Sequence, residues 1–188
     1  MDISDLLKYP QLVDVIKVYN NAKKVTQLYE LEEIDNYELD IEEPKIKIPD
    51  FLSDEDLKPL YDQYEYLMTN FYKNATKIIE KNFDLKDQWS VSSFKLIPKQ
   101  SLRSILESMH DDLFELNILF KEKNIEENIS AIVEYGKSLE ESLKILEETE
   151  KENEDAIKEI EKEIKKIKSD YEEMLKETLK DIIKNKGK

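Results

Sequence analysis

Apolar residues recur at every third or fourth position from Ile125 to Thr178, and this is the longest regular pattern in the chain. The steps alternate between four and three residues, as in a heptad repeat with apolar a and d positions. A straight helix drifts by about 20° per heptad against such a repeat, so a frame held over about seven heptads predicts a left-handed coiled coil. The predicted interaction seam consists of Ile129, Ile132, Leu139, Leu143, Leu146, Ile157, Ile160, Ile164, Ile167, Tyr171 and Met174.

The partner of this seam is expected to lie at least partly outside the chain. Residues 124–188 are predicted to form a coiled-coil arm, and a helix from Ile125 to Asn185 would be about 90 Å long, more than the upstream helices can cover. Burying one isoleucine contributes about 1.5–3 kcal/mol, so a second copy or another coiled-coil protein is expected to cover the rest. Isoleucine at both a and d from Ile157 to Ile167 favours three or more helices, which either the head of the same chain or other proteins would supply.

Three weak positions interrupt the seam, at Gly136, Glu150 and Asn153. Polar residues at core positions of a coiled coil set its register and oligomeric state at some cost in stability. The alternative interpretation is that these residues mark the place where the arm leaves the rest of the fold and becomes solvated.

Residues 1–34 are predicted to form an N-terminal helix. Pro10 suits the first turn of a helix, where its missing N–H costs nothing, and apolar residues then keep the helical period to about Leu31. Residues 35–52 break this period, because Leu39 and Ile41 alternate with acidic residues. This segment is predicted to be an acidic extended strap over the helices or a short hairpin, and the alternative is a docking segment that becomes ordered on a partner.

Residues 53–123 are predicted to form a helical bundle head. Ser53 is placed as an N-cap before three acidic residues, although a start at Asp56 would bring Pro59 into the first turn. The apolar face of this helix extends to about Asn82. Six aromatic residues between Tyr61 and Phe83 would suit a ligand pocket or a protein interface, but the helical spacing of the apolar residues favours a core.

Residues 84–98 look irregular, with a hint of an extended piece, and Trp89 is expected to close one end of the bundle. Helical spacing returns from Ser101, and its frame misses the frame of the arm by one residue near Lys123 and Asn124. A break at that point and one continuous helix from Ser101 to Asn185 are the two expectations. The predicted fold class is all-α, a helical bundle head with a long C-terminal coiled-coil helix, and the presence of only two glycines argues against a many-stranded sheet.

Composition and charge narrow the function classes. The chain has no cysteine, no signal-peptide pattern and no run of about 18 apolar residues, so we expect a cytoplasmic protein without a membrane span. A net charge of −15 argues against direct binding of nucleic acid. Residues 30–56 hold twelve acidic residues and two lysines, and the acidic strap residues Glu38, Asp40, Glu42 and Glu43 are candidates for binding a basic partner.

The sequence offers little that resembles an active site. Phosphate-binding loops require glycines that this chain lacks near its helix starts. Glu107 and His110 spell one E-x-x-H motif, whereas a di-iron helical bundle needs it twice together with two more glutamates. Carboxylate pairs such as Glu30 with Glu33 have a spacing suited to Mg²⁺, but they arise by chance in a chain with 44 acidic residues.

We therefore expect no catalytic residues, no metal and no cofactor. The predicted function is that of a non-enzymatic structural protein that oligomerises or joins a larger complex of protein partners through its C-terminal coiled coil. The alternative is an acidic adaptor or inhibitor that binds a basic protein surface through residues 30–56.

Overall fold

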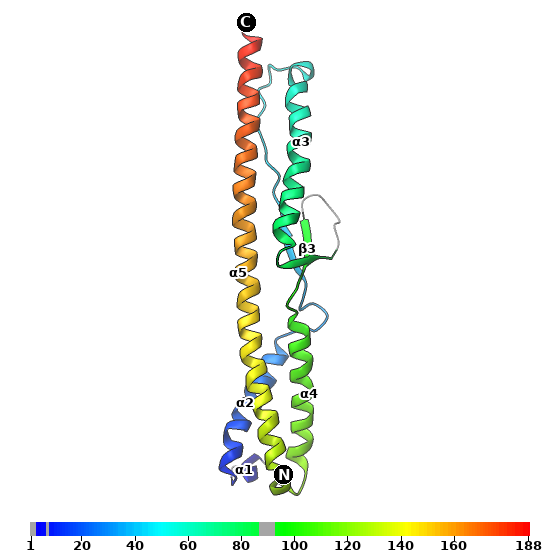
Figure 1. Ribbon diagram of the computed structural model, residues 1–188, viewed down its shortest axis with the longest axis vertical. Coiled ribbons are helices and arrows are strands. Elements are labelled where there is room, and N and C mark those ends of the chain that lie inside the picture. Colours follow the sequence, from blue (N-terminus) through cyan, green and yellow to red (C-terminus); the bar gives the residue numbers. More distant parts are fainter. Residues whose placement is uncertain (1–2, 7, 87–92) are drawn as a thin grey trace. The chain divides into compact units, whose positions relative to one another are not determined.

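The computed structural model of the protein describes residues 3–6, 8–86 and 93–188 (Figure 1). Trp89, expected to close one end of a bundle, lies outside the described residues. The chain is mostly helical and ends in a long helix. Its elements are, in order, α1 (Ile3–Leu6), α2 (Pro10–Gln27), β1 (Tyr37–Asp40), α3 (Asp54–Ile79), β2 (Phe83–Leu85), β3 (Ser93–Pro98), α4 (Leu102–Lys121) and α5 (Ile125–Lys186).

Two compact units share these elements. Unit 1 consists of Met1–Asn36 and Gln100–Asn153, and unit 2 consists of Tyr37–Lys99 and Glu154–Lys188. Each unit therefore combines an early segment of the chain with one half of α5. These units cross the boundaries of the four consecutive segments that the sequence suggested.

The all-α prediction needs a correction, because unit 2 contains a three-stranded antiparallel sheet. The strand order is β1-β3-β2, with Leu39 opposite Phe94 and Phe83 opposite Pro98. Side chains alternate between the two faces of a strand, and this places Leu39, Phe94 and Leu96 in the core of the unit. The alternation of Leu39 and Ile41 with acidic residues was thus the signal of an edge strand that pairs with a distant segment.

Unit 1 is built around a core that α2, α4 and the first half of α5 share. Ser101 caps α4, since its hydroxyl accepts a hydrogen bond from the Arg103 N–H at 3.2 Å and donates one to Asp35 at 2.6 Å. Asp35 also accepts a hydrogen bond from the N–H of Leu102, so the loop before β1 holds the start of α4. The buried core consists of Leu6, Leu12, Val15, Ile16, Ala22, Leu102, Leu106, Met109, Leu116, Ile125, Ile132, Leu139 and Leu146.

Unit 2 packs α3 and the sheet against the second half of α5. The predicted N-cap is confirmed: the Ser53 hydroxyl accepts from the N–H of Asp56, and the Asp56 carboxylate accepts from the N–H of Ser53. Pro59 lies inside α3, which ends at Ile79, earlier than the pattern suggested. Phe71, Ile79, Phe83, Phe94, Leu96, Ile160, Ile164, Leu175 and Leu179 are among the buried residues of this core.

The helix breaks between α4 and α5, which confirms the first of the two expectations, a break near Asn124. Residues 122–124 are not helical, and the amide of Asn128 donates hydrogen bonds to the carboxylate of Glu122 and the carbonyl of Asn124. From Ile125 onward α5 continues for 62 residues without a proline.

Candidate functional site

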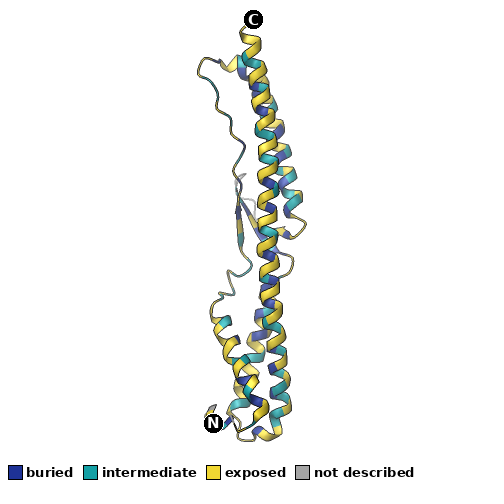
Figure 2. Cartoon of the chain, turned by 90° about the vertical axis from the view of Figure 1, so that its left-hand side faces the viewer, coloured by how far each residue is buried: buried dark blue, intermediate teal, exposed yellow. Residues whose placement is uncertain are grey.

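The predicted interaction seam of α5 faces the cores of its own chain. The d positions Ile132, Leu139, Leu146 and Ile160 are buried, while the a positions Ile129, Leu143 and Ile157 are half-buried against the same two cores. Figure 2 shows that exposed positions recur along the whole length of α5. Up to residue 153 the seam is thus covered by α2 and α4 of unit 1. From residue 154 onward it is covered by α3 and the sheet of unit 2.

The heptad frame does not hold to the end of the seam. Met174, placed at d by the heptad count, is 45% exposed, and Leu175 takes the buried position instead. Ile164 and Leu175 are eleven residues apart, a spacing close to the period of an undistorted helix. Beyond Ile167 the drift of the helix therefore moves part of the buried stripe off the heptad frame, since Leu175 replaces Met174 while Tyr171 stays half-buried against the core.

Two of the three weak positions of the seam, Gly136 and Glu150, are explained by contacts within unit 1. A Cβ atom added at Gly136 would lie 2.8 Å from Cγ2 of Val15, so the glycine permits a close approach of α2 to α5. The carboxylate of Glu150 accepts a hydrogen bond of 2.9 Å from the hydroxyl of Tyr29. Asn153 is buried, and its Nδ2 has no hydrogen-bond partner in the part of the chain that the structure describes.

Two of the four acidic strap residues are engaged within unit 2. Lys168 donates a hydrogen bond of 2.9 Å to Glu42, and this contact lowers the pKa of the Glu42 carboxyl. The hydroxyls of Tyr64 and Tyr72 donate to Glu43 at 3.2 and 2.7 Å. Burial, and then the Glu43 carboxylate, raises the pKa of both tyrosines, so both remain neutral donors at physiological pH.

The other two strap acids, Glu38 and Asp40, are exposed on β1. Between them Leu39 is buried, as is Ile41 beyond the end of the strand, so this part of the strap is anchored by its aliphatic side chains. The acidic strap therefore presents two outward carboxylates on a packed segment.

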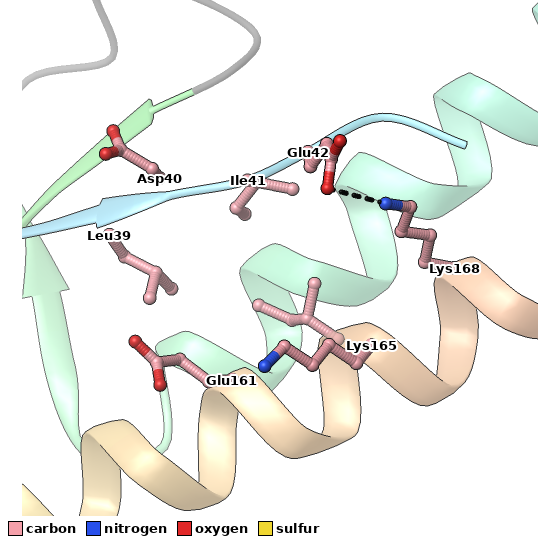
Figure 3. A pocket seen from close by; sticks show the side chains of 8 residues that line it. Leu39, Asp40, Ile41, Glu42, Glu161, Lys165 and Lys168 are labelled. Carbon is pink, nitrogen blue, oxygen red and sulfur yellow. Dashed lines mark hydrogen bonds and ion pairs between the residues drawn. The ribbon is translucent and has the colours of Figure 1, made fainter. Parts of the chain in front are cut away.

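A groove of about 430 Å³, here called the α5 groove, lies where the strap crosses α5 within unit 2. Figure 3 shows Leu39 and Ile41 pointing toward α5, Asp40 pointing away from it, and the ion pair of Glu42 with Lys168. Glu161 and Lys165 supply opposite charges on the α5 side. Because the lining mixes both signs of charge and Lys168, one of its two lysines, is already paired with Glu42, the groove favours no particular ligand.

Two exposed apolar residues of unit 1 lie one helical turn apart on α4. Phe114 is 64% exposed, and Ile118, one turn further along, is 41% exposed. Both lie on the side of α4 opposite to Met109 and Leu116, which face the core. We call Phe114 and Ile118 together with the exposed acids Glu107, Asp111 and Glu115 the α4 surface.

A hollow of about 390 Å³ adjoins the α4 surface. Phe114 lines it together with His110 and Leu113 of α4 and with Tyr19 and Lys23 of α2. The sequence pattern did not predict this surface, because a helix is expected to bury one apolar stripe. The available signal was a second, shorter apolar pair on α4 with the spacing of one helical turn.

The described residues provide no metal site or membrane span. No group of three or more histidine and carboxylate side chains in that part of the chain is arranged to hold a metal ion. None of the helices searched there is both long and apolar enough to cross a membrane.

Comparison with known proteins found no matching protein family, no matching curated protein and no matching solved structure. The arguments for function therefore come from the surfaces of the chain itself.

Proposed function

We propose that the protein is a non-enzymatic binding protein that joins a larger assembly by docking a basic amphipathic helix of another protein on the α4 surface. In this proposal α2, α4 and residues 125–153 of α5 act as a helical bundle that presents this surface. The interface differs from the seam expected from the sequence, since the seam residues pack in the cores of their own chain.

The observation that carries the proposal is the exposure of Phe114 and Ile118 on the outer side of α4. Large exposed apolar residues that adjoin a hollow are typical of the anchor positions of protein interfaces, where aromatic side chains contribute most. A partner helix would place its apolar side chains over this pair and into the hollow beside Phe114.

The charge of unit 1 supports a basic partner. This unit holds 21 acidic and 10 basic residues. Asp111 and Glu115 accompany the apolar pair on α4, whereas Glu107 is already ion-paired with Arg103 at 3.1 Å. Complementary charge speeds the encounter of two proteins and selects between partners. The same charge disfavours a second copy of the chain as the occupant, because two acidic surfaces would face each other.

The test uses the full chain and two synthetic helical peptides with the same leucine face. One peptide carries lysine and arginine on its polar face and the other carries glutamate. We expect calorimetry to detect binding of the basic peptide only, and the double variant Phe114→Ser with Ile118→Ser to weaken it by about tenfold or more. Tyr66→Ser is the matched control, because Tyr66 is 68% exposed but belongs to unit 2.

The thermal midpoint of the double variant is expected to remain close to that of the wild type, since neither side chain is buried. Equal binding of the basic peptide to the wild type and the double variant would contradict the proposal, as would binding of both peptides alike.

A further inference from the structure

We propose that the strap beside α3 in unit 2 binds an extended acidic peptide segment of another protein by β-strand addition. The proposed site is a hollow of about 370 Å³, here called the α3 groove. It is lined by Pro44, Lys45, Ile46, Ile48, Leu60, Tyr61 and Tyr64. This site goes beyond the proposed function, because it uses other residues and another class of ligand than the α4 surface.

The first argument is the unpaired backbone of the strap. The N–H of Lys45 reaches the carboxylate of Glu172 at 3.5 Å. The N–H and C=O groups of Ile46, Lys47 and Ile48 form no hydrogen bond with any residue that the structure describes. A row of unpaired backbone groups on an extended segment is a template on which another chain can form a strand.

The backbone N–H and C=O groups of residues 46–48 have a direction that follows from the course of the chain. Ile48 precedes Pro49, and residues before proline favour extended conformations, so the segment between Pro44 and Pro49 is suited to an extended course. Successive backbone groups of an extended chain point to opposite edges. The N–H of Lys45 reaches Glu172 of α5, so along an extended course the N–H groups of Ile46 and Ile48 would point to the opposite edge, away from Glu172.

A further argument is the apolar lining of the α3 groove. Ile46, Ile48 and Tyr64 are half-buried, and Tyr61 of α3 is 47% exposed. The volume of the groove lies in the range of typical ligand pockets. In β-strand addition the backbone supplies affinity and such pockets receive alternate side chains of the added strand, which gives specificity.

Charge indicates which peptide fits. Lys45 is the charged residue of the lining and is close enough to Glu42 for its charge to lower the pKa of that carboxyl, after the larger effect of Lys168. Lys47, two positions further along the strap, is exposed. The neighbouring carboxylate of Glu43 is held by the hydroxyls of Tyr64 and Tyr72. An added strand with apolar residues at alternate positions and acidic residues between them would place its carboxylates beside the two lysines.

The experiment measures the fluorescence anisotropy of a labelled peptide of alternating valine and glutamate with the full chain. A peptide with lysine in place of glutamate is the charge control. We expect the glutamate peptide to bind at least about tenfold more tightly than the lysine peptide, and Tyr61→Ser to weaken its binding by a similar factor. Tyr66→Ser is the matched control, because Tyr66 is exposed on α3 but does not line the groove.

Two further peptides test the backbone argument, with N-methyl groups at every second residue in one frame or the other. An added strand uses the N–H groups of only one of its edges. One methylated frame should therefore lose binding by about tenfold or more, and the other should keep it. Equal binding of both frames, or unchanged binding by Tyr61→Ser, would overturn the proposal.

Concentration-dependent dimerisation that the glutamate peptide suppresses would also overturn the proposal, because it would assign the groove to a second copy of the chain. None of these outcomes bears on the α4 surface, so the two proposals fail independently.

Discussion

Substitution of Gly136 by alanine tests the packing of unit 1, because two opposing effects meet at this position. Alanine is favoured over glycine inside a helix by about 1 kcal/mol. The added Cβ atom, however, would lie 2.8 Å from Cγ2 and 3.0 Å from Cγ1 of Val15 on α2. Valine is stiff about χ1 and cannot easily turn its methyl groups away, so α2 or α5 would have to shift.

The structure allows the balance of these effects to be estimated. Overpacking a well-packed core typically costs about 1–3 kcal/mol. Set against the gain of about 1 kcal/mol in helix propensity, Gly136→Ala should lower the free energy of unfolding by about 0–2 kcal/mol. In a Val15→Ala background both methyl contacts are gone, and the same substitution should instead raise the free energy of unfolding by about 1 kcal/mol.

The assay is urea denaturation followed by circular dichroism for the wild type, both single variants and the double variant. The double-mutant cycle should give a coupling energy of about 1–3 kcal/mol between the two positions. If Gly136→Ala were stabilising by the same amount in both backgrounds, α2 would not approach α5 at this glycine. The packing described for unit 1 would then be wrong.

Three further predictions concern other parts of the fold. Leu139→Ala should lower the free energy of unfolding by about 2–5 kcal/mol, whereas Ile145→Ala, at a position 42% exposed on the same helix, should change it by less than about 0.5 kcal/mol in denaturation experiments. The contact with Lys186 lowers the pKa of Asp56 to about 2 from 3.8. The stabilisation that this contact provides is therefore present above pH 3.8 and is lost as the pH falls toward about 2. Thermal midpoints measured over this pH range should fall more for the wild type than for Asp56→Asn. Tyr72→Phe removes a hydrogen bond to a carboxylate and should lower the free energy of unfolding by about 1 kcal/mol, measured by urea denaturation at pH 7.

The local pattern of the sequence identified the helices well. The seam residues from Ile132 to Ile160 are spaced by heptads, and in the structure they lie on the buried side of α5. The Ser53 cap followed from a serine placed before three acidic residues. The one-residue mismatch of two helical frames indicated a break before Ile125 as one of two expectations. These features depend on neighbours within a few residues, which is why one sequence suffices to predict them.

The sheet could not be predicted in the same way. β1 pairs with β3, and more than fifty residues separate Leu39 from its opposite residue Phe94. A four-residue strand followed by prolines carries little periodic signal, and nothing in its own sequence identifies the partner. The alternation at Leu39 and Ile41 indicated an extended segment, but its place beside β3 depends on tertiary contacts.

The heptad repeat of α5 also could not predict which surface covers the seam. A heptad repeat shows that a helix buries one stripe, but it is silent on whether the covering surface belongs to the same chain. The stripe of α5 is covered by α2 and α4 in unit 1 and by α3 and the sheet in unit 2. Gly136 held a clue, since a residue without a side chain permits another backbone to approach closely.

Sedimentation equilibrium of the full chain tests most directly the claim that the apolar stripe of α5 is buried within its own chain. We predict a single species of 22.4 kDa at tens of micromolar protein, because the stripe is already covered and the acidic surfaces of two copies repel each other. A stable dimer or trimer that dissociates in the double variant Ile160→Asp with Ile167→Asp, while the single chains remain folded, would contradict this account.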